Sequence, residues 1–150
     1  MPNTLFSSMH VSAAGLSAQR ARLDVVAENI ANAESTRTEK GGPYRRRQVV
    51  FQAVSTESRS FSSVFQSSFN QAGSLQSVKV AKTIEDPSPF REVYDPSNPD
   101  ADVNGNVKMP NVNAVQEMVD MNSAARSFEA NVTVMEASKR MFLKSLELMR

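Results

Sequence analysis

The chain has 150 residues, no cysteine, and 17 basic against 16 acidic side chains, which leaves a formal net charge of +1. This length is sufficient for one globular domain, but the balanced charge argues against a general nucleic-acid binder, which needs a strongly basic surface. The absence of cysteine excludes disulfides and thiolate metal sites.

The sequence contains no pattern for a membrane span. No run approaches the roughly 18 consecutive apolar residues of a transmembrane helix, so we expect no direct membrane insertion. Residues 1–20 have neither an early Lys or Arg nor an unbroken apolar core, so we expect no cleaved signal peptide. The chain is therefore expected either in the cytoplasm or exported without a cleaved signal.

The first predicted element is a long helix over residues 5–33. Alternating steps of four and three residues place mostly apolar side chains on one stripe, with Ser12 and Gln19 as its two polar members. Alanines beside the stripe favour a helix and permit the close approach of another helix. The seam positions on this stripe are Leu5, Met9, Leu16, Leu23, Val26 and Ile30.

Two asparagines, Asn29 and Asn32, lie near the end of this helix, although asparagine is unfavourable in a helix interior. One of them is explained as a cap in the left-handed conformation that often ends a helix. A cap does not explain the second, which raises the question of what this side of the helix faces.

Residues 44–54 and 78–84 predict two strands, because the first stretch gathers β-branched and aromatic residues and the second alternates apolar residues with Lys or Ala. Residues 55–77 hold nine serines and regularly spaced phenylalanines, which fits either a short amphipathic helix or a loop. The turn-rich residues 85–90 and 94–110 are expected to connect elements rather than to form them.

Arg45, Arg46 and Arg47 form the main local basic cluster. In a strand, alternation would place Arg45 and Arg47 on one face and Arg46 on the other, which divides the positive patch. We therefore favour a salt-bridged protein contact or a solvated face over a contact with nucleic acid.

A second long helix is predicted to follow the start signal of Pro110 with Asn111 or Asn113. Its stripe repeats the steps of four and three, with Lys139 as a polar member, and the two helices would be about 45 and 55–60 Å long. The seam positions are Met118, Met121, Ala125, Phe128, Val132, Met135, Phe142, Leu146 and Met149. The flanks of such narrow stripes either serve helices of other chains or belong to an ordinary helical core.

No set of residues predicts catalysis. His10 is the only histidine, and the chain has neither a phosphate-binding loop nor a dinucleotide motif. Asp95, Asp100 and Asp102 lack the spacing of an EF-hand loop, and no serine has a histidine partner or an SxxK arrangement. We therefore expect no catalytic residue, metal site, cofactor or small-molecule substrate, and we expect that the protein is not an enzyme.

Several stretches resemble a known family. Residues 13–38, "AAGLSAQRARLDVVAENIANAESTRT", resemble the N-terminal helix of the flagellar axial proteins. Three further stretches are similar to the proximal-rod members of that family: "GGPYRRRQVVF", "VAKTIEDPSPFREVYDPSNPDAD" and "PNVNAVQEMVDMNSAARSFEANVTVMEASKRM". The resemblance covers the chain except residues 55–73. Ser97 and Asn98 stand where the family usually has Gly-His, and Asn106 where it usually has Tyr, departures that concern local loop packing.

The residue patterns predict a mainly α fold with a small β-containing insertion, and the resemblance implies that the terminal helices pair as a coiled coil. Residues 1–36 and 111–150 would each supply one helix of that coiled-coil domain, and residues 37–110 would form a central region of strands and loops. The resemblance further implies a structural subunit of the bacterial flagellar basal-body rod. Such a subunit polymerises through its terminal helices into a tubular segment of the proximal rod, with the C-terminal helix toward the channel.

The resemblance also implies partners and a location. The partners are other copies of the chain, other rod and rod-base proteins, and the flagellar type III export apparatus, which would carry the chain to the periplasm. We expect the seam residues at subunit interfaces and Asn29, Asn32, Arg45, Arg46 and Arg47 as polar assembly contacts. The alternative is a non-enzymatic helical adaptor that grips a single protein partner, and self-association or co-assembly with rod proteins would distinguish the two.

Overall fold

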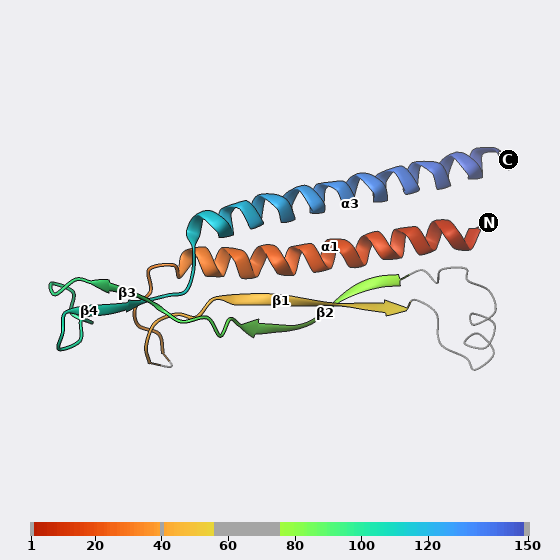
Figure 1. The fold of residues 1–150 in the computed structure, drawn as a ribbon. Helices are drawn as coiled ribbons and strands as arrows, with labels where there is room; N and C mark the ends of the chain where they lie inside the picture. The colour runs from red at the N-terminus through yellow and green to blue at the C-terminus, as the bar shows by residue number, and fades with distance from the viewer. Residues whose placement is uncertain (1, 40, 56–75, 149–150) are drawn as a thin grey trace, which may run out of the picture. The chain divides into compact units, whose positions relative to one another are not determined.

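The computed structural model describes residues 2–39, 41–55 and 76–148. These residues form two long helices, one near each end of the chain, with four strands between them in sequence (Figure 1). The elements are α1 (Pro2–Ala31), β1 (Arg47–Ser55), β2 (Gln76–Glu85), β3 (Arg91–Tyr94), β4 (Asn106–Met109) and α3 (Ala114–Leu148).

The mainly α fold with a small β insertion is confirmed, whereas the coiled-coil geometry stays a prediction. The choice between helix and loop within residues 55–77 lies almost entirely outside the described residues.

The chain forms two compact units, each built from parts of both helices and of the strands between them. The first unit contains Met1–Gln19, Phe51–Ala81 and Arg126–Arg150. The second unit contains Arg20–Val50 and Lys82–Ala125. Each unit therefore brings together segments that are far apart in the sequence. Neither described helix is long and apolar enough to cross a membrane.

In the first unit, the beginning of α1 packs against the end of α3. The rings of Phe6 and Phe142 meet edge to face, with their centroids 5.4 Å apart. Gly15 lies so close to Asn131 that a Cβ atom at the glycine would be 3.1 Å from the amide nitrogen of that side chain. A larger residue at position 15 would push the amide away, so glycine permits the close approach of the helices here. The two contacts pair an earlier α1 residue with a later α3 residue, so these segments run antiparallel.

Helix α1 ends through a side chain rather than through a left-handed residue. The Asn32 amide nitrogen donates to the carbonyl of Glu28 at 2.9 Å, and the Asn32 amide oxygen accepts from the hydroxyl of Ser35 at 3.2 Å. Among the described residues, a positive φ occurs only at glycines. The left-handed asparagine cap is therefore not the device that ends this helix. The Asn32 side chain instead adds a second hydrogen bond to the Glu28 carbonyl, which also accepts from the backbone amide of Asn32 at 3.1 Å.

Helix α3 begins at the predicted start signal. The side-chain oxygen of Asn113 accepts from the backbone amides of Val115 at 3.1 Å and of Gln116 at 3.3 Å. This bonding satisfies donors that the first turn of a helix leaves without partners, which confirms Asn113 as the cap. Asn111 has a different role, because its side-chain oxygen accepts from the backbone amide of Arg46 at 2.8 Å.

The two predicted strands are confirmed as β1 and β2, which form a two-stranded sheet and run in opposite directions (Figure 1). Strand β1 begins at Arg47, later than the predicted position 44. The reason is that the backbone amides of Tyr44 and Arg46 donate to oxygen atoms outside the sheet, at 3.0 and 2.8 Å respectively. The amides of Tyr44 and Arg46 therefore lie outside the ladder, while the carbonyl of Arg46 accepts from the backbone amide of Asp86, the residue after β2, at 2.8 Å.

The expectation that residues 94–110 only connect elements is wrong, because β4 lies among them. It pairs with β3 as an antiparallel hairpin, with Tyr94 opposite Asn106 at the end nearest the loop. Each strand has only four residues, too few to show a clear period of two, and the intervening loop contains the residues that signal turns. Gly105 completes this loop with a φ of 77°. A Cβ atom at this position would lie 2.9 Å from the Tyr94 ring.

The most buried described positions of α3 are Glu117, Ala124 and Ser138, with exposed fractions of 1, 0 and 3%. They are separated by multiples of seven residues, as a helix seam requires, but each lies one residue before a position of the predicted stripe. Met118, which was predicted to lie in the seam, is 57% exposed. Ala124 and Ser138 are small and permit close approach of another helix, whereas Glu117 is a large side chain that needs polar partners when buried. The role of the predicted stripe at helix interfaces stays a prediction.

Candidate functional site

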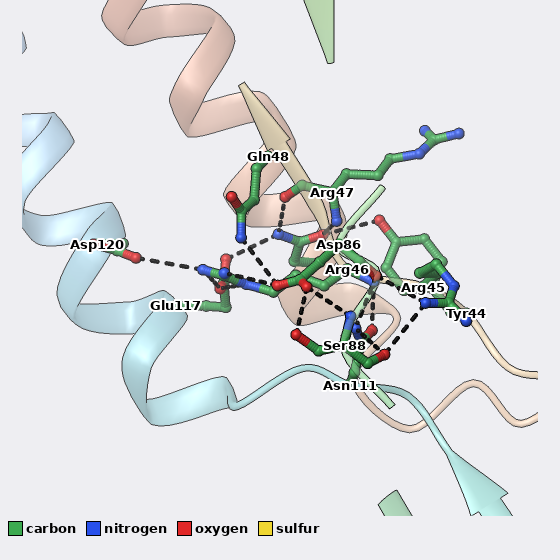
Figure 2. Close-up of polar contacts among 11 residues, drawn as sticks. Tyr44, Arg45, Arg46, Arg47, Gln48, Asp86, Ser88, Asn111, Glu117 and Asp120 are labelled. Carbon is green, nitrogen blue, oxygen red and sulfur yellow. Dashed lines mark hydrogen bonds and ion pairs between the residues drawn. The ribbon is translucent and has the colours of Figure 1, made fainter. Parts of the chain in front are cut away.

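A cluster of polar side chains connects four parts of the second unit: the end of α1, the start of β1, the residues after β2 and the start of α3 (Figure 2). We call this cluster the arginine junction. Its members are Asn29, Tyr44, Arg45, Arg46, Arg47, Asp86, Glu117 and Asp120. The structure thus brings together four of the five predicted polar contact residues, while Asn32 lies beyond the cluster as the cap of α1.

Asn29 is 1% exposed and uses the full hydrogen-bonding capacity of its amide. The nitrogen donates to the carbonyl of Arg47 at 2.9 Å and to Oε2 of Glu117 at 3.0 Å. The oxygen accepts from the backbone amide of Arg47 at 2.9 Å and from the hydroxyl of Tyr44 at 3.0 Å. An amide has two donor and two acceptor positions, so a contact from Asn29 to a neighbouring subunit would have to replace one of these bonds.

Arg46 and Glu117 form the central ion pair. Nε and Nη2 of Arg46 lie 2.7 and 2.6 Å from Oε1 of Glu117. The Glu117 side chain is 1% exposed and the Arg46 side chain 22% exposed. A carboxylate in this position is strongly unfavourable without a partner, and two nitrogens of one guanidinium, together with the Asn29 amide, satisfy it.

Further charges surround this pair. Arg46 also lies 3.6 Å from Asp86 and 3.7 Å from Asp120. Arg22 on α1 approaches Asp120 on α3 at 3.3 Å, so a second ion pair connects the same two helices. The charges form a network in which the guanidinium of Arg46 faces three carboxylates.

Arg45 and Arg47 make contacts on other sides of the backbone. Nη1 of Arg47 donates to Glu28 at 2.7 Å, and this hydrogen bond and charge raise the pKa of Arg47. Nη1 of Arg45 donates to the backbone carbonyls of Asp86 and Ser88 at 2.9 and 3.2 Å, while its guanidinium lies 4.4 Å from the centre of the Phe90 ring. The favoured interpretation of the basic cluster as salt-bridged therefore applies within the chain itself.

Asp86 is the acidic residue that follows β2. The hydroxyl and the backbone amide of Ser88 both donate to its carboxylate, and Gln48 donates to it at 3.0 Å. The hydrogen bonds from Ser88, followed by the bond and charge of Arg46, lower the pKa of Asp86. The carboxylate is therefore held in its ionised form, which suits its place beside the arginines.

Tyr44 lies beside Asn29 with an exposed fraction of 8%. Burial, and then the negative charge of Glu28, raise its pKa to about 12. The neutral phenol is thus the stable form, and it donates its proton to Asn29. This bond connects the start of β1 to the end of α1.

The structure places the predicted seam residues at different depths. Val26 is buried, and Met118 and Leu146 are exposed. Leu5 and Met149 lie outside the residues whose side chains are described. The half-buried members are Met9, Leu16, Leu23, Ile30, Met121, Ala125, Phe128, Val132, Met135 and Phe142. Their role at interfaces between subunits stays a prediction.

The sequence analysis did not identify the acidic members of the junction. Glu117 lies on the same heptad line as Ala124, and this spacing was the one signal that pointed to it. The apolar pattern predicts the neighbouring Met118 as the seam residue instead of Glu117. A carboxylate at a helix seam is unfavourable unless a residue from elsewhere in the chain satisfies it. That residue is Arg46, which is 71 residues away in the sequence.

The chemistry of the junction is that of a connection between elements. Its charged groups face one another, and no group of three His, Asp or Glu side chains in the described part of the chain converges to hold a metal ion. An open cavity of about 440 Å³ adjoins the junction, with Glu28, Tyr44, Arg47 and Phe90 in its wall. His10 lies exposed on α1, in the first unit.

Comparisons with known proteins place these features in a family. A family model described as "Flagella basal body rod protein" matches residues 9–37, and one described as "Flagellar basal body rod FlgEFG protein C-terminal" matches residues 103–148. The flagellar basal-body rod protein FlgC of Bacillus subtilis (strain 168) is 47% identical over 150 residues, which cover 97% of this chain and 98% of that protein. The proteins of the same description from Borreliella burgdorferi and Salmonella typhimurium are 45% and 42% identical, and each alignment covers at least 96% of this chain and 97% of the relative. The chain belongs to the flagellar basal-body rod protein FlgC family.

Proposed function

We propose that this chain is a structural, non-enzymatic subunit of the flagellar basal-body rod, and that it polymerises through its terminal helices into a tubular segment of the proximal rod. The names and the near-complete coverage of its relatives support the rod. The observation that carries polymerisation is a series of apolar side chains on α3, each about half exposed or more. They are Val115, Met118, Val119, Val134, Met141, Leu143, Leu146 and Leu148. Exposed apolar surface of this extent is typical of interaction sites.

The arrangement of the helices in the rod is part of this proposal. The helix of residues 1–36 and the helix of residues 111–150 form one coiled-coil domain around which residues 37–110 supply the strands and loops. The exposed seam residues Met118 and Leu146 contact neighbouring subunits. Asn32 and the arginines contribute polar contacts, whereas Asn29, whose amide is saturated within the chain, acts on assembly by holding the junction.

The route and the partners belong to the proposal as well. The chain is carried by the flagellar type III export apparatus and assembles in the periplasm. Its partners are other copies of itself and other rod and rod-base proteins. The resemblance to the family supports this route.

Sedimentation velocity of the purified chain, alone and mixed with the other rod proteins of its organism, tests the proposal. We expect concentration-dependent self-association or co-assembly, and we expect the Met118→Asp variant to lose it. Gln116→Asp is the matched control, since it adds the same charge at an exposed position of the same helix. Circular dichroism would show that both variants keep their helices. A one-to-one complex with a single protein, without self-association, would contradict polymerisation and favour the adaptor.

A further inference from the structure

The end of α3 presents a basic and partly apolar surface. Residues 137–146, which we call the basic segment, contain Lys139, Arg140 and Lys144 and no acidic residue. All three basic side chains are exposed. Met141 and Leu143 lie among them and are 54% and 49% exposed. A partner for this surface would combine apolar contact with negative charge.

The loop of the β3–β4 hairpin has the complementary properties. Residues 95–105, which we call the acidic loop, contain three aspartates and no basic residue. Val103 in this loop is 102% exposed, and Tyr94 at its base is 72% exposed. No described residue therefore buries the Val103 side chain, and its burial against a partner would be favourable.

The acidic loop is also held in one shape. The Asp102 carboxylate accepts from the backbone amides of Asn104 at 2.8 Å and of Asn106 at 3.2 Å. The amide of Gly105 donates to the carbonyl of Asp102 at 2.9 Å, and the amide of Asp95 donates to the carbonyl of Gly105 at 2.9 Å. A loop that is already ordered loses little conformational entropy on binding.

We propose that the acidic loop of one copy of this chain docks on the basic segment of α3 in a second copy, with Val103 packed against Met141. On a helix Met141 shares a face with Arg140 and Lys144, so the negative charges of the loop then lie opposite these two positive charges. The contact joins two different surfaces, so it leaves one free surface of each kind on every pair of copies, and further copies extend it into a ring or an open helical polymer. This inference rests on the proposed function and adds a specific contact to it.

Cysteine cross-linking tests the contact, because the chain has no cysteine of its own. Full-length Val103→Cys is mixed with full-length Met141→Cys, and disulfide formation between the two is measured after mild oxidation. The matched control is Val119→Cys, a residue of α3 that is 59% exposed, close to the 54% of Met141, but lies outside the basic segment. We expect Val103→Cys to cross-link to Met141→Cys and about tenfold less to Val119→Cys.

Charge reversal supplies an independent measurement. We expect Arg140→Glu with Lys144→Glu, on the Met141→Cys chain, to lower the cross-link yield about tenfold, and Asp100→Lys on the Val103→Cys chain to restore much of it. Asp100 also accepts from the hydroxyl of Thr36 at 2.7 Å, so Thr36→Val controls for the loss of that bond. The yield should also fall with added salt, which screens charges on exposed surfaces.

The outcomes separate this contact from the proposed function. Equal cross-linking to Met141→Cys and Val119→Cys, or yields that charge reversal does not change, would overturn the contact even where the chain still self-associates. Cross-links only within single chains, detected when one of the two variants carries a size tag, would overturn it as well. If the unaltered chain neither self-associated nor co-assembled with other rod proteins, the proposed function would be overturned instead.

Discussion

Tyr44 offers a prediction at the scale of a single residue. Its raised pKa of about 12, against an ordinary 10.0, means that the folded chain keeps the phenol proton at pH values where the unfolded chain releases it. The stability that depends on this proton is complete below pH 10 and is lost as the pH rises from about 10 to 12. We expect the urea midpoint of unfolding to fall over this interval, and to fall less in Tyr44→Phe.

The control for Tyr44 is the second tyrosine of the chain. Tyr94 is 72% exposed, so Tyr94→Phe leaves the junction intact and should keep the steep alkaline loss of the unaltered chain. It also leaves Tyr44 as the only tyrosine, so absorbance titration near 295 nm reports its ionisation alone. Ionisation of Tyr44 at its ordinary value in the folded chain would contradict the assignment of this proton to a buried bond with Asn29.

Asp86 leads to the opposite dependence on pH. Hydrogen bonds from Ser88 and the charge of Arg46 lower its pKa below the ordinary 3.8. Its contribution to stability is therefore present above that value and is lost as the pH falls below it. We expect Asp86→Asn to reduce the loss of stability between neutral and acidic pH, measured by urea unfolding. Asp24→Asn, at an exposed position of α1, is the control and should follow the unaltered chain.

The connection between elements depends on the pair Arg46 and Glu117. Replacement of Glu117 by Met leaves the guanidinium without its closest partner, and loss of one member of such a pair costs about 3–5 kcal/mol. The double variant with Arg46→Met removes both charges, and we expect it to regain a large part of that free energy of unfolding. The measurement is a double-mutant cycle by denaturant unfolding.

Additive effects in that cycle would contradict the coupling of α3 to β1 through this pair. The pair Arg22 and Asp120 supplies a comparison, since it joins α1 and α3 at 3.3 Å with both side chains more exposed. Exposed pairs contribute little, roughly 0–1 kcal/mol. We expect Asp120→Asn to have a much smaller effect than Glu117→Met.

At the scale of the whole molecule, the described parts of the two units have unequal cores. The buried apolar residues of the described chain are Ala18, Val26, Tyr44, Val107 and Ala124, and Ala18 is the one that belongs to the first unit. The arginine junction also lies in the second unit. Ordering a residue costs about 1–2 kcal/mol of backbone entropy, so we expect the helix segments of the first unit to depend more on neighbouring chains.

Hydrogen exchange tests this difference between the units. In dilute monomer, we expect the amides of residues 6–19 and 126–148 to exchange faster than those of residues 20–31 and 114–125. Assembly should slow the exchange of the first group most. Equal protection of both groups, in a sample shown by ultracentrifugation to be monomeric, would mean that the first unit is stable without neighbours.

The sequence alone was sufficient to predict the two long helices, a start of α3 at Asn111 or Asn113 and the strands β1 and β2. These features depend on local signals, namely the spacing of apolar residues, a capping side chain and a gathering of β-branched residues. The family was also accessible, because the resemblance extended over nearly the whole chain. Strands β3 and β4 escaped prediction because four residues show no clear alternation and the loop between them is rich in turn residues.

Only the tertiary structure decided the positions that depend on partners far away in the chain. It buried Glu117 rather than the neighbouring Met118, and it gave Asn29 four partners within its own chain. The physical reason is the same in both cases: a buried polar group is stable only where donors and acceptors surround it. For Glu117 those donors come from α1 and from the residue that precedes β1, and neither is near it in the sequence.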